Sequence, residues 1–248
     1  MLNSSEVRQA ALDVGFDDCG IARADALTEG EFPLRRWLEE GCQGELHYLE
    51  RNADKRQDPR LLLPGARSVI CVVSAYPPPD PSARGGVASY ARTRDYHATI
   101  KPMLAALRQR LGIEGKLCCD TVPISDKHWA ARAGLGWIGR HTLLITPRWG
   151  TWVNLGEIVT TEPCSDYADP TAMEARARFC NRCNRCVEAC PNHALGPLFQ
   201  ARRCTAYYTT HTPRPMPPGL TDGGYTLGCD LCQLACPFNA DKILHQRQ

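Results

Sequence analysis

Fourteen cysteines stand in this chain, and seven of them form two closely spaced runs near its carboxyl end. The first run reads C-x2-C-x2-C-x3-C-P and comprises Cys180, Cys183, Cys186 and Cys190. This spacing is typical of bacterial ferredoxins, in which the fourth thiolate serves the other cluster of a pair. The second run reads C-x2-C-x3-C-P, lacks a first cysteine of its own, and comprises Cys229, Cys232 and Cys236. The two runs therefore predict an electron-carrying module.

The ligand that the second run lacks can come from Cys204, which lies between the two runs. One predicted [4Fe–4S] cluster is held by Cys180, Cys183, Cys186 and the distant Cys236, and the other by Cys190, Cys204, Cys229 and Cys232. Structural zinc is the alternative, because paired C-x2-C motifs also build zinc sites. Two reciprocal C-P endings favour iron–sulfur. Disulfides are disfavoured, because the amino-terminal sequence does not resemble an export signal.

The composition is that of a globular protein. The chain has 248 residues, 43% of them hydrophobic, which suffices for one sizeable core and a small appended module. The formal net charge of +2 argues against a dedicated nucleic-acid binder, which would carry a strong basic field. No apolar stretch approaches the roughly 18 residues of a membrane span. We therefore expect a monomeric cytoplasmic protein.

The residues before the cysteines must form the core that positions the chemistry. The run SVICVVSA at 68–75 is β-branched and continuous, which predicts a buried central strand. A stripe of apolar residues at helical spacing predicts a helix over 95–111. Further predicted helices cover 4–15, 33–40, 44–52 and 125–133, and further strands cover 18–22, 117–120 and a hairpin of 143–146 with 151–159. A polar connector at 55–60, a mobile proline-rich loop at 77–86 that could act as a lid, and a linker at 162–179 complete the chain.

Three glycines, Gly134, Gly136 and Gly139, spell G-x-G-x-x-G. In a dinucleotide-binding loop these letters follow a strand and open a helix. Here they follow a predicted helix and open a predicted strand at 141–145, so we reject nicotinamide binding. The glycines instead allow a close approach of the backbone to another group.

Two adjacent cysteines, Cys118 and Cys119, fall in the predicted strand 117–120. Neighbouring residues of a strand point to opposite faces, so one of these thiols could line a site. The simpler interpretation is one buried thiol and one incidental thiol. Cys71, within the apolar run, is interpreted as a small buried hydrophobic residue.

Several stretches, taken together and in order, resemble the cobalamin-dependent epoxyqueuosine reductases. They are NADKR at 52–56, DPRLLLPGARSVI at 58–70, RDYH at 94–97, CDTVPI at 119–124, ARAGLGWIG at 131–139, LGE at 155–157 and ARRC at 201–204, with both cysteine runs. The resemblance covers nearly the whole chain. More distantly, it extends to the reductive dehalogenases.

This resemblance implies an enzyme that reduces epoxyqueuosine in tRNA to queuosine. It implies an α+β fold: a nitroreductase- or dehalogenase-like corrinoid-binding domain at 1–162, then a ferredoxin-like module at 163–248. Cobalamin is expected beside the second cluster, with no protein histidine on cobalt. Electrons would pass from reduced flavodoxin or ferredoxin through the Cys180 cluster and the Cys190 cluster to cobalt. The tRNA anticodon stem-loop is the expected partner, and no membrane is.

The resemblance also implies site residues. Asp120 matches the catalytic aspartate, although a turn or helix-cap aspartate is the alternative. Lys127 stands where the family has an arginine, and the two side chains are not equivalent at a bidentate site. Lys127 would hold substrate oxygen or tune Asp120, or else be a solvated lysine. The expected cofactor contacts are Arg56, His97, Asp120, Arg140, His141 and Thr142. Arg56 could instead form a surface salt bridge, and His97 could be structural.

A second departure concerns the tRNA. The family usually continues after the second C-P motif with helical repeats that help to hold tRNA, and we expect this chain to lack them. A corrinoid reductase of a small molecule and a ferredoxin-type electron carrier are therefore alternatives. Arginines crowd the cysteine module and could meet phosphate or an acidic electron donor, or be simply solvated. They are Arg176, Arg178, Arg182, Arg185, Arg202 and Arg203.

Overall fold

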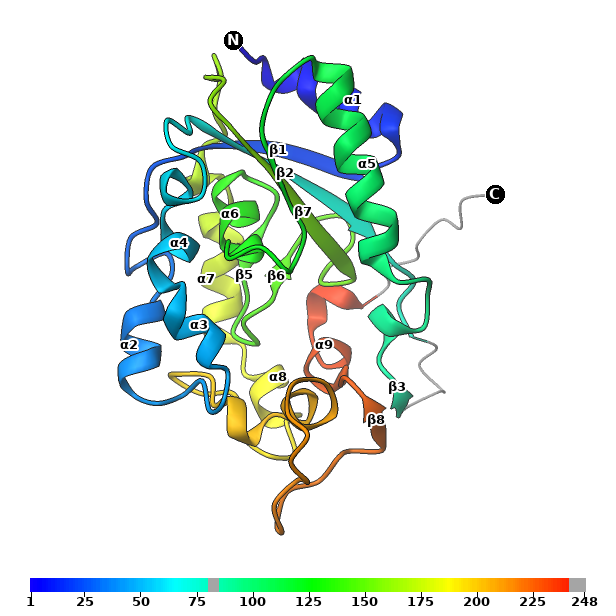
Figure 1. Ribbon diagram of the computed structural model, residues 1–248. Coiled ribbons are helices and arrows are strands. Elements are labelled where there is room, and N and C mark those ends of the chain that lie inside the picture. The colour runs from blue at the N-terminus through cyan, green and yellow to red at the C-terminus, as the bar shows by residue number, and fades with distance from the viewer. Residues whose placement is uncertain (80–84, 241–248) are drawn as a thin grey trace.

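The computed structural model describes residues 1–79 and 85–240. A twisted sheet with helices on both faces occupies one half of the molecule, and the cysteine-rich segment lies beneath it (Figure 1). The predicted lid at 77–86 lies largely outside the described residues. The predicted α+β class is confirmed, because every ladder of the main sheet is antiparallel.

The main sheet has four strands in the order β1-β2-β7-β4. Their bounds are β1 Asp18–Arg23, β2 Ser68–Ala75, β7 Val153–Thr160 and β4 Lys116–Cys118. The predicted central strand at 68–75 is confirmed: β2 pairs with β1 on one side and β7 on the other, and its first six residues are buried. An uninterrupted apolar run suits this place because both faces of the strand are covered.

Alternate residues of β2 enter two separate cores. Ile70 and Val72 pack under α1 (Ser4–Val14) and α5 (Tyr96–Leu111), while Cys71 and its alternate neighbours pack under α6 (Asp126–Arg132). Cys118 and Cys119 divide in the same way, one to each core. The prediction that they face opposite ways is confirmed. Both are buried, however, so neither lines a site.

Three short helices flank the sheet on the side of α6. They are α2 (Leu34–Glu39), α3 (His47–Arg51) and α4 (Ala53–Gln57). The prediction of a plain connector at 55–60 was wrong, since α4 and a 3₁₀ turn at Pro59–Leu61 occupy it. Asp58 explains the turn, because its carboxylate accepts a hydrogen bond from the backbone N–H of Arg60.

The glycine segment forms a small ladder of its own. Strand β5 (Trp137–Ile138) pairs with β6 (Leu144–Ile145), so the predicted pairing of 143–146 with 151–159 was wrong. Gly136 explains the difference: a Cβ there would lie 2.2 Å from the carbonyl oxygen of Ile145. The glycines do follow a helix, and Gly136 does allow a close backbone approach, as the sequence indicated. The predicted strand at 141–145 is shorter, covering Leu144–Ile145, and β5 lies between the glycines instead.

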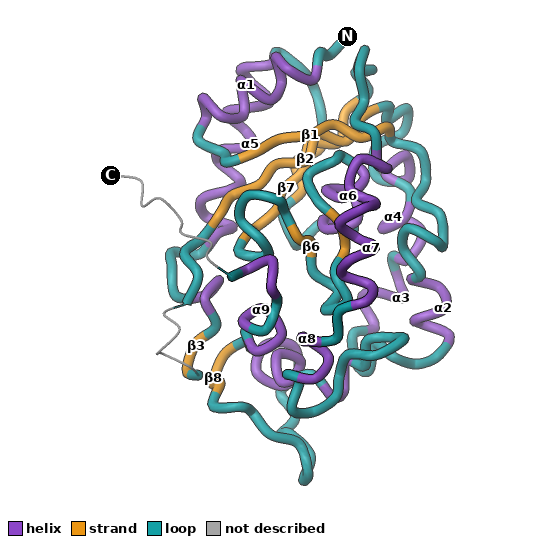
Figure 2. Tube along the Cα trace, turned by 180° about the vertical axis from the view of Figure 1, so that it is seen from behind, coloured by secondary structure: helices purple, strands orange, loops and turns teal. Residues whose placement is uncertain are grey.

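The cysteine module contains α7 (Glu174–Arg182), α8 (Arg185–Glu188), α9 (Leu231–Leu234) and β8 (Tyr225–Leu227). The predicted linker at 162–179 was partly wrong, because α7 begins within it. Strand β8 pairs in parallel with β3 (Gly86–Val87), joining distant parts of the chain, as Figure 2 shows from behind. The backbone N–H of Ser89 also donates to Asp230, at 2.8 Å.

Candidate functional site

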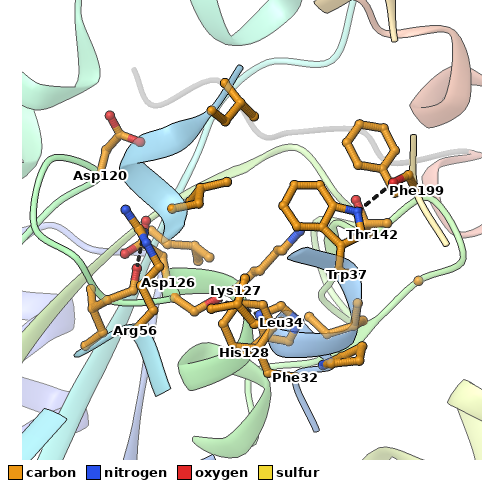
Figure 3. A pocket seen from close by; sticks show the side chains of 18 of the residues that line it. Phe32, Leu34, Trp37, Arg56, Asp120, Asp126, Lys127, His128, Thr142 and Phe199 are labelled. Atoms are coloured by element: carbon orange, nitrogen blue, oxygen red, sulfur yellow. Dashed lines mark hydrogen bonds between the residues drawn. The ribbon is translucent and has the colours of Figure 1, made fainter. Parts of the chain in front are cut away.

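A cavity of about 790 Å³ lies between the sheet half and the cysteine module (Figure 3). One wall is apolar and aromatic, with Phe32, Leu34 and Trp37 from α2 and its approach. The opposite wall carries Arg56 and Asp120, and the start of α6 forms the floor with Asp126, Lys127 and His128. The Trp37 indole Nε1 donates to the carbonyl oxygen of Phe199 at 2.6 Å, which ties the apolar wall to the module. Such a mixture of apolar walls and a few polar groups is typical of a cofactor site.

Asp120 stands at the turn that follows β4, with a backbone φ of +58°. A non-glycine residue in the left-handed region is uncommon and is often found where function places a side chain. The side chain is 59% exposed, and its Oδ2 lies 3.2 Å from Nε2 of His97. His97 Nδ1 in turn lies 2.8 Å from Oδ1 of Asp95. The structure therefore brings Asp120 and His97 together, with Asp95 orienting the imidazole.

Lys127 lines both the large cavity and a second cavity of about 360 Å³ on its module side. Burial lowers the pKa of its ammonium group to about 8, although the Asp126 carboxylate acts in the opposite direction. Within the described part of the chain, no hydrogen bond joins Lys127 to Asp120. The geometry thus puts Lys127 at the junction of the two cavities and leaves His97 as the partner of Asp120.

The other expected cofactor contacts are spread around the two cavities. Arg56 donates through Nη1 to the carbonyl oxygen of Ile124 at 3.4 Å, and burial lowers its pKa. Arg140 lines the large cavity and donates to the carbonyl oxygen of Asn181 at 3.1 Å. Thr142, at a φ of +68°, lines both cavities.

His141 does not line the large cavity. It borders the second cavity and the small hollow around Cys180, so it lies between the two groups of cysteines. Burial lowers its pKa to about 4, and the nearby Lys127 adds to the effect. The imidazole is therefore neutral at physiological pH, with Nδ1 accepting from the backbone N–H of Leu143 at 3.2 Å.

A buried pair of carboxyl groups under the cavity was not predicted. Glu157, on β7, stands directly opposite Cys71 and Cys118 in the sheet, so it faces α6 and meets Asp126 there. Apart from the Asp126 carboxyl, neither carboxyl oxygen of Glu157 has a hydrogen-bond partner among the described residues. Burial raises the pKa of both acids, that of Asp126 to about 6. The signals in the sequence are a glutamate within an apolar strand run and its place in the LGE stretch at 155–157.

The cysteines gather into two groups of four. The second cavity is lined by Cys190, Cys204, Cys229 and Cys232, and a small hollow is lined by Cys180, Cys183, Cys186 and Cys236. These are the crossed sets that the spacing predicts, each with one cysteine from the other end of the module. Burial and the neighbouring thiols raise the pKa of Cys229 and of Cys236 to about 11.

The donor set fits clusters better than single ions. Over residues 1–79 and 85–240, no three His, Cys, Asp or Glu side chains converge as closely as one metal ion requires. Four thiols around a common hollow suit a group several ångströms across, which disfavours structural zinc. The assignment of each cysteine to its cluster stays a prediction.

Comparison with known protein families supports both the reductase resemblance and the pair of iron–sulfur clusters. The family model "Epoxyqueuosine reductase QueG, DUF1730" matches residues 56–125, and the model "4Fe-4S double cluster binding domain" matches residues 179–239. The chain is 38% identical to the epoxyqueuosine reductase of Gloeobacter violaceus over 95% of its own length and 76% of that protein. This chain belongs to the epoxyqueuosine reductase family. It contains the double-cluster domain of that family, as predicted.

Solved structures support the fold of this reductase. The chain matches an epoxyqueuosine reductase crystallised with an epoxyqueuosine-modified tRNA stem-loop, with a TM-score of 0.86 and 29% identity over 97% of this chain and 66% of that one. It also matches the Bacillus subtilis epoxyqueuosine reductase, with its catalytic aspartate loop swung out, at a TM-score of 0.81 and 28% identity, over 98% and 67% of the two chains. A catabolic reductive dehalogenase matches at a TM-score of 0.59 and 18% identity, over 95% of this chain and 32% of that one, which shows a shared fold. In the described residues, no helix is long and apolar enough to span a bilayer.

Proposed function

We propose that this reductase converts epoxyqueuosine in tRNA to queuosine, with Asp120 as the acid. The observation that carries the proposal is the position of Asp120: it lies on a turn at the rim of the large cavity, held by His97, while a cysteine group lines the adjoining cavity. The relative solved with a modified stem-loop supports the substrate. In this proposal residues 1–162 form the substrate and corrinoid domain and residues 163–248 form the cluster module.

Cobalamin is the proposed occupant of the large cavity. A corrin is a broad, mostly apolar ring edged with amides, and the cavity offers an aromatic wall together with polar groups at its rim. Arg56, Arg140 and Thr142 are placed to hold those amides. Arg56 retains an Nε–H that has no partner in the described structure, as a donor reserved for a ligand would. When bound, the corrinoid supplies the electrons that the epoxide takes up.

The reaction needs two electrons and two protons, because an epoxide becomes an alkene and its oxygen leaves as water. Asp120 donates a proton to the oxygen as a carbon–oxygen bond breaks, and His97 holds the carboxyl in place. The swung-out aspartate loop of the Bacillus subtilis relative supports a mobile acid of this kind. Lys127, at the junction of the cavities, keeps a positive charge close to the developing negative charge on that oxygen.

The electron source is proposed to be a reduced flavodoxin or ferredoxin in the cytoplasm, and the enzyme is proposed to act as a monomer. The Cys180 group would hold the cluster that accepts electrons, and the Cys190 group would hold the cluster that passes them on, since of the two groups only the latter lines the cavity that adjoins the proposed corrinoid site.

The test is anaerobic reconstitution with iron, sulfide and cobalamin, followed by metal analysis and a turnover assay. About eight irons and one cobalt per chain are expected, together with conversion of epoxyqueuosine in a modified anticodon stem-loop. Whole tRNA and the free nucleoside are assayed beside the stem-loop. Fully loaded enzyme that converts none of the three would refute the proposal and favour a corrinoid reductase of a small molecule.

A further inference from the structure

The face of α7 carries an aromatic ring in solvent beside the Cys180 group. Phe179 is 58% exposed, one of the few large apolar side chains so exposed among the described residues. Its ring packs edge-on against Phe238 at 5.6 Å, and Phe238 packs against Trp137 at 4.8 Å. The next residue along the chain, Cys180, is buried in the same apolar cluster as Trp137. An exposed aromatic ring directly beside a predicted cluster ligand indicates a surface that another protein contacts.

Four arginines surround this ring in sequence, and all four are exposed. They are Arg176, Arg178, Arg182 and Arg185. Among the residues that the structure describes, none of the four forms an ion pair with an acidic side chain within 4.0 Å. Only two glutamates, Glu174 and Glu188, accompany them on α7 and α8, so this short segment carries as much net positive charge as the whole chain. Unpaired positive charge around an apolar centre is complementary to an acidic partner.

The position of this face in the electron path gives the partner its chemistry. Of the two cysteine groups, the Cys190 group lines the cavity that adjoins the large cavity, together with residues from both halves of the molecule. The Cys180 group lies next to α7, whose last turn and following residue supply Cys180 and Cys183; Figure 2 shows where this helix lies. Because electron transfer slows steeply with distance, a donor must approach the Cys180 group, and α7 carries both the buried Cys180 and the exposed Phe179.

We propose that the exposed face of α7, centred on Phe179, is the docking site of a small acidic protein that delivers one electron at a time. The inference rests on the proposed function, which requires two electrons per epoxide. Each encounter would oxidise the carrier by one electron and reduce the [4Fe–4S] cluster that the Cys180 group would hold by one electron, and no covalent bond changes. Two encounters complete one turnover. Such encounters use small interfaces and depend on charge for their association rate.

The experiment measures the bimolecular rate at which the reduced carrier bleaches the clusters of the holoenzyme in an anaerobic stopped-flow instrument. The probe is flavodoxin in its hydroquinone form, an acidic protein. The double variant Arg178→Glu/Arg182→Glu is compared with Lys116→Glu/Arg67→Glu, which reverses the same number of exposed charges beside the far end of β7. Photoreduced deazaflavin serves as a small reductant that needs no docking surface.

At low ionic strength the α7 variant should react at least about tenfold more slowly than the control variant, and the difference should shrink as salt screens the charges. Reduction by deazaflavin should be the same in both. Phe179→Ala should also slow the reaction with flavodoxin, and Phe179→Tyr, which retains the ring, should restore most of the rate. Flavodoxin rates that are equal in the two double variants would overturn the proposal.

The same arginines could instead face tRNA phosphates, so stem-loop binding is measured for both double variants. Weaker stem-loop binding by the α7 variant, with an unchanged flavodoxin rate, would assign this face to RNA and refute the inference. Cluster reduction is observed without substrate. The rate of cluster reduction by flavodoxin can therefore be measured even if the enzyme does not convert epoxyqueuosine. A failure of the docking proposal and a failure of the proposed function can be distinguished in this way.

Discussion

Residues 1–164 build two extensive apolar cores, one on each face of the four-stranded sheet, whereas the cysteine module contributes to only two small apolar clusters. The module instead gathers eight thiols around two hollows. Burial of apolar surface stabilises the fold of the first region. The fold of the second region depends on bonds between its thiolates and the metal clusters that they would hold. The large cavity between the two regions therefore depends on both kinds of stabilisation, because each region supplies part of its lining.

The largest expected effect comes from removing one cluster ligand, which should destabilise the cysteine module and leave the four-stranded sheet intact. Cys204→Ala should lower the iron content from about eight to about four per chain and abolish turnover, because the electron path to the cavity is interrupted. Amide hydrogen exchange should increase across 186–236 and remain slow in β2 and β7. Cys164→Ala, which removes a buried thiol outside both groups, should retain about eight irons. Full iron in Cys204→Ala would remove Cys204 from the ligand set.

The second prediction concerns the acid at the rim. Asp120→Asn keeps the size of the side chain and loses its proton, so turnover should fall by roughly 10²- to 10⁴-fold, the usual contribution of a placed general acid. Iron content should stay unchanged, since Asp120 lies outside both cysteine groups. Cobalamin should still bind, since Asn keeps the shape of a side chain that stands at the rim of the large cavity. Single-turnover kinetics measure the effect. An Asp120→Asn enzyme with wild-type turnover would rule out the acid role.

The third prediction uses the pKa of Lys127, which burial lowers to about 8. The ammonium group is charged below that pH and neutral above it, so wild-type turnover should decline as the pH rises through 8, by about tenfold at pH 9. Lys127→Arg retains its charge throughout this range and should remove the decline. A pH profile of kcat for both enzymes provides the measurement. If both profiles keep the same alkaline limb, another group is responsible.

The smallest effect concerns the buried pair in the sheet half. Burial raises the pKa of Glu157, so the folded protein retains a proton that the unfolded chain releases above about pH 4.5. Stability should therefore fall as the pH rises towards the pKa of the folded state, by at most about 1.4 kcal/mol per pH unit. Glu157→Gln should flatten this slope. Urea unfolding between pH 6 and pH 8 tests it, and an unchanged slope would contradict the assignment.

Sequence reasoning succeeded where the determining interactions are local or where a known spacing, such as the C-P endings that exchange Cys190 and Cys236, specifies the distant partner. The cysteine runs predicted two groups of thiols because a turning chain brings residues two or three apart together, and the apolar run at 68–75 predicted β2 for a similar reason. It failed where the partner is distant and no known spacing specifies it. The pairing of β6 with β5 depends on the contact between Gly136 and Ile145, which no period in the sequence reveals.

The residues of the candidate site show the same difference between what a motif predicts and what only the folded chain brings together. Asp120 was found through a motif, but its partner His97 lies 23 residues earlier and meets it only in the folded chain. To predict that Asp126 contacts Glu157, one must know both the register of β7 in the sheet and the position of α6 over it.

The crossed arrangement of the thiols has a consequence for biosynthesis. Each proposed cluster takes one ligand from the other end of the module, and the last ligands of the two, Cys232 and Cys236, are only four residues apart. A ribosome translating this message would expose six of the eight ligand thiols before either set is complete. Loading of iron and sulfide must therefore follow translation of the whole module, and the two clusters become possible almost at the same moment.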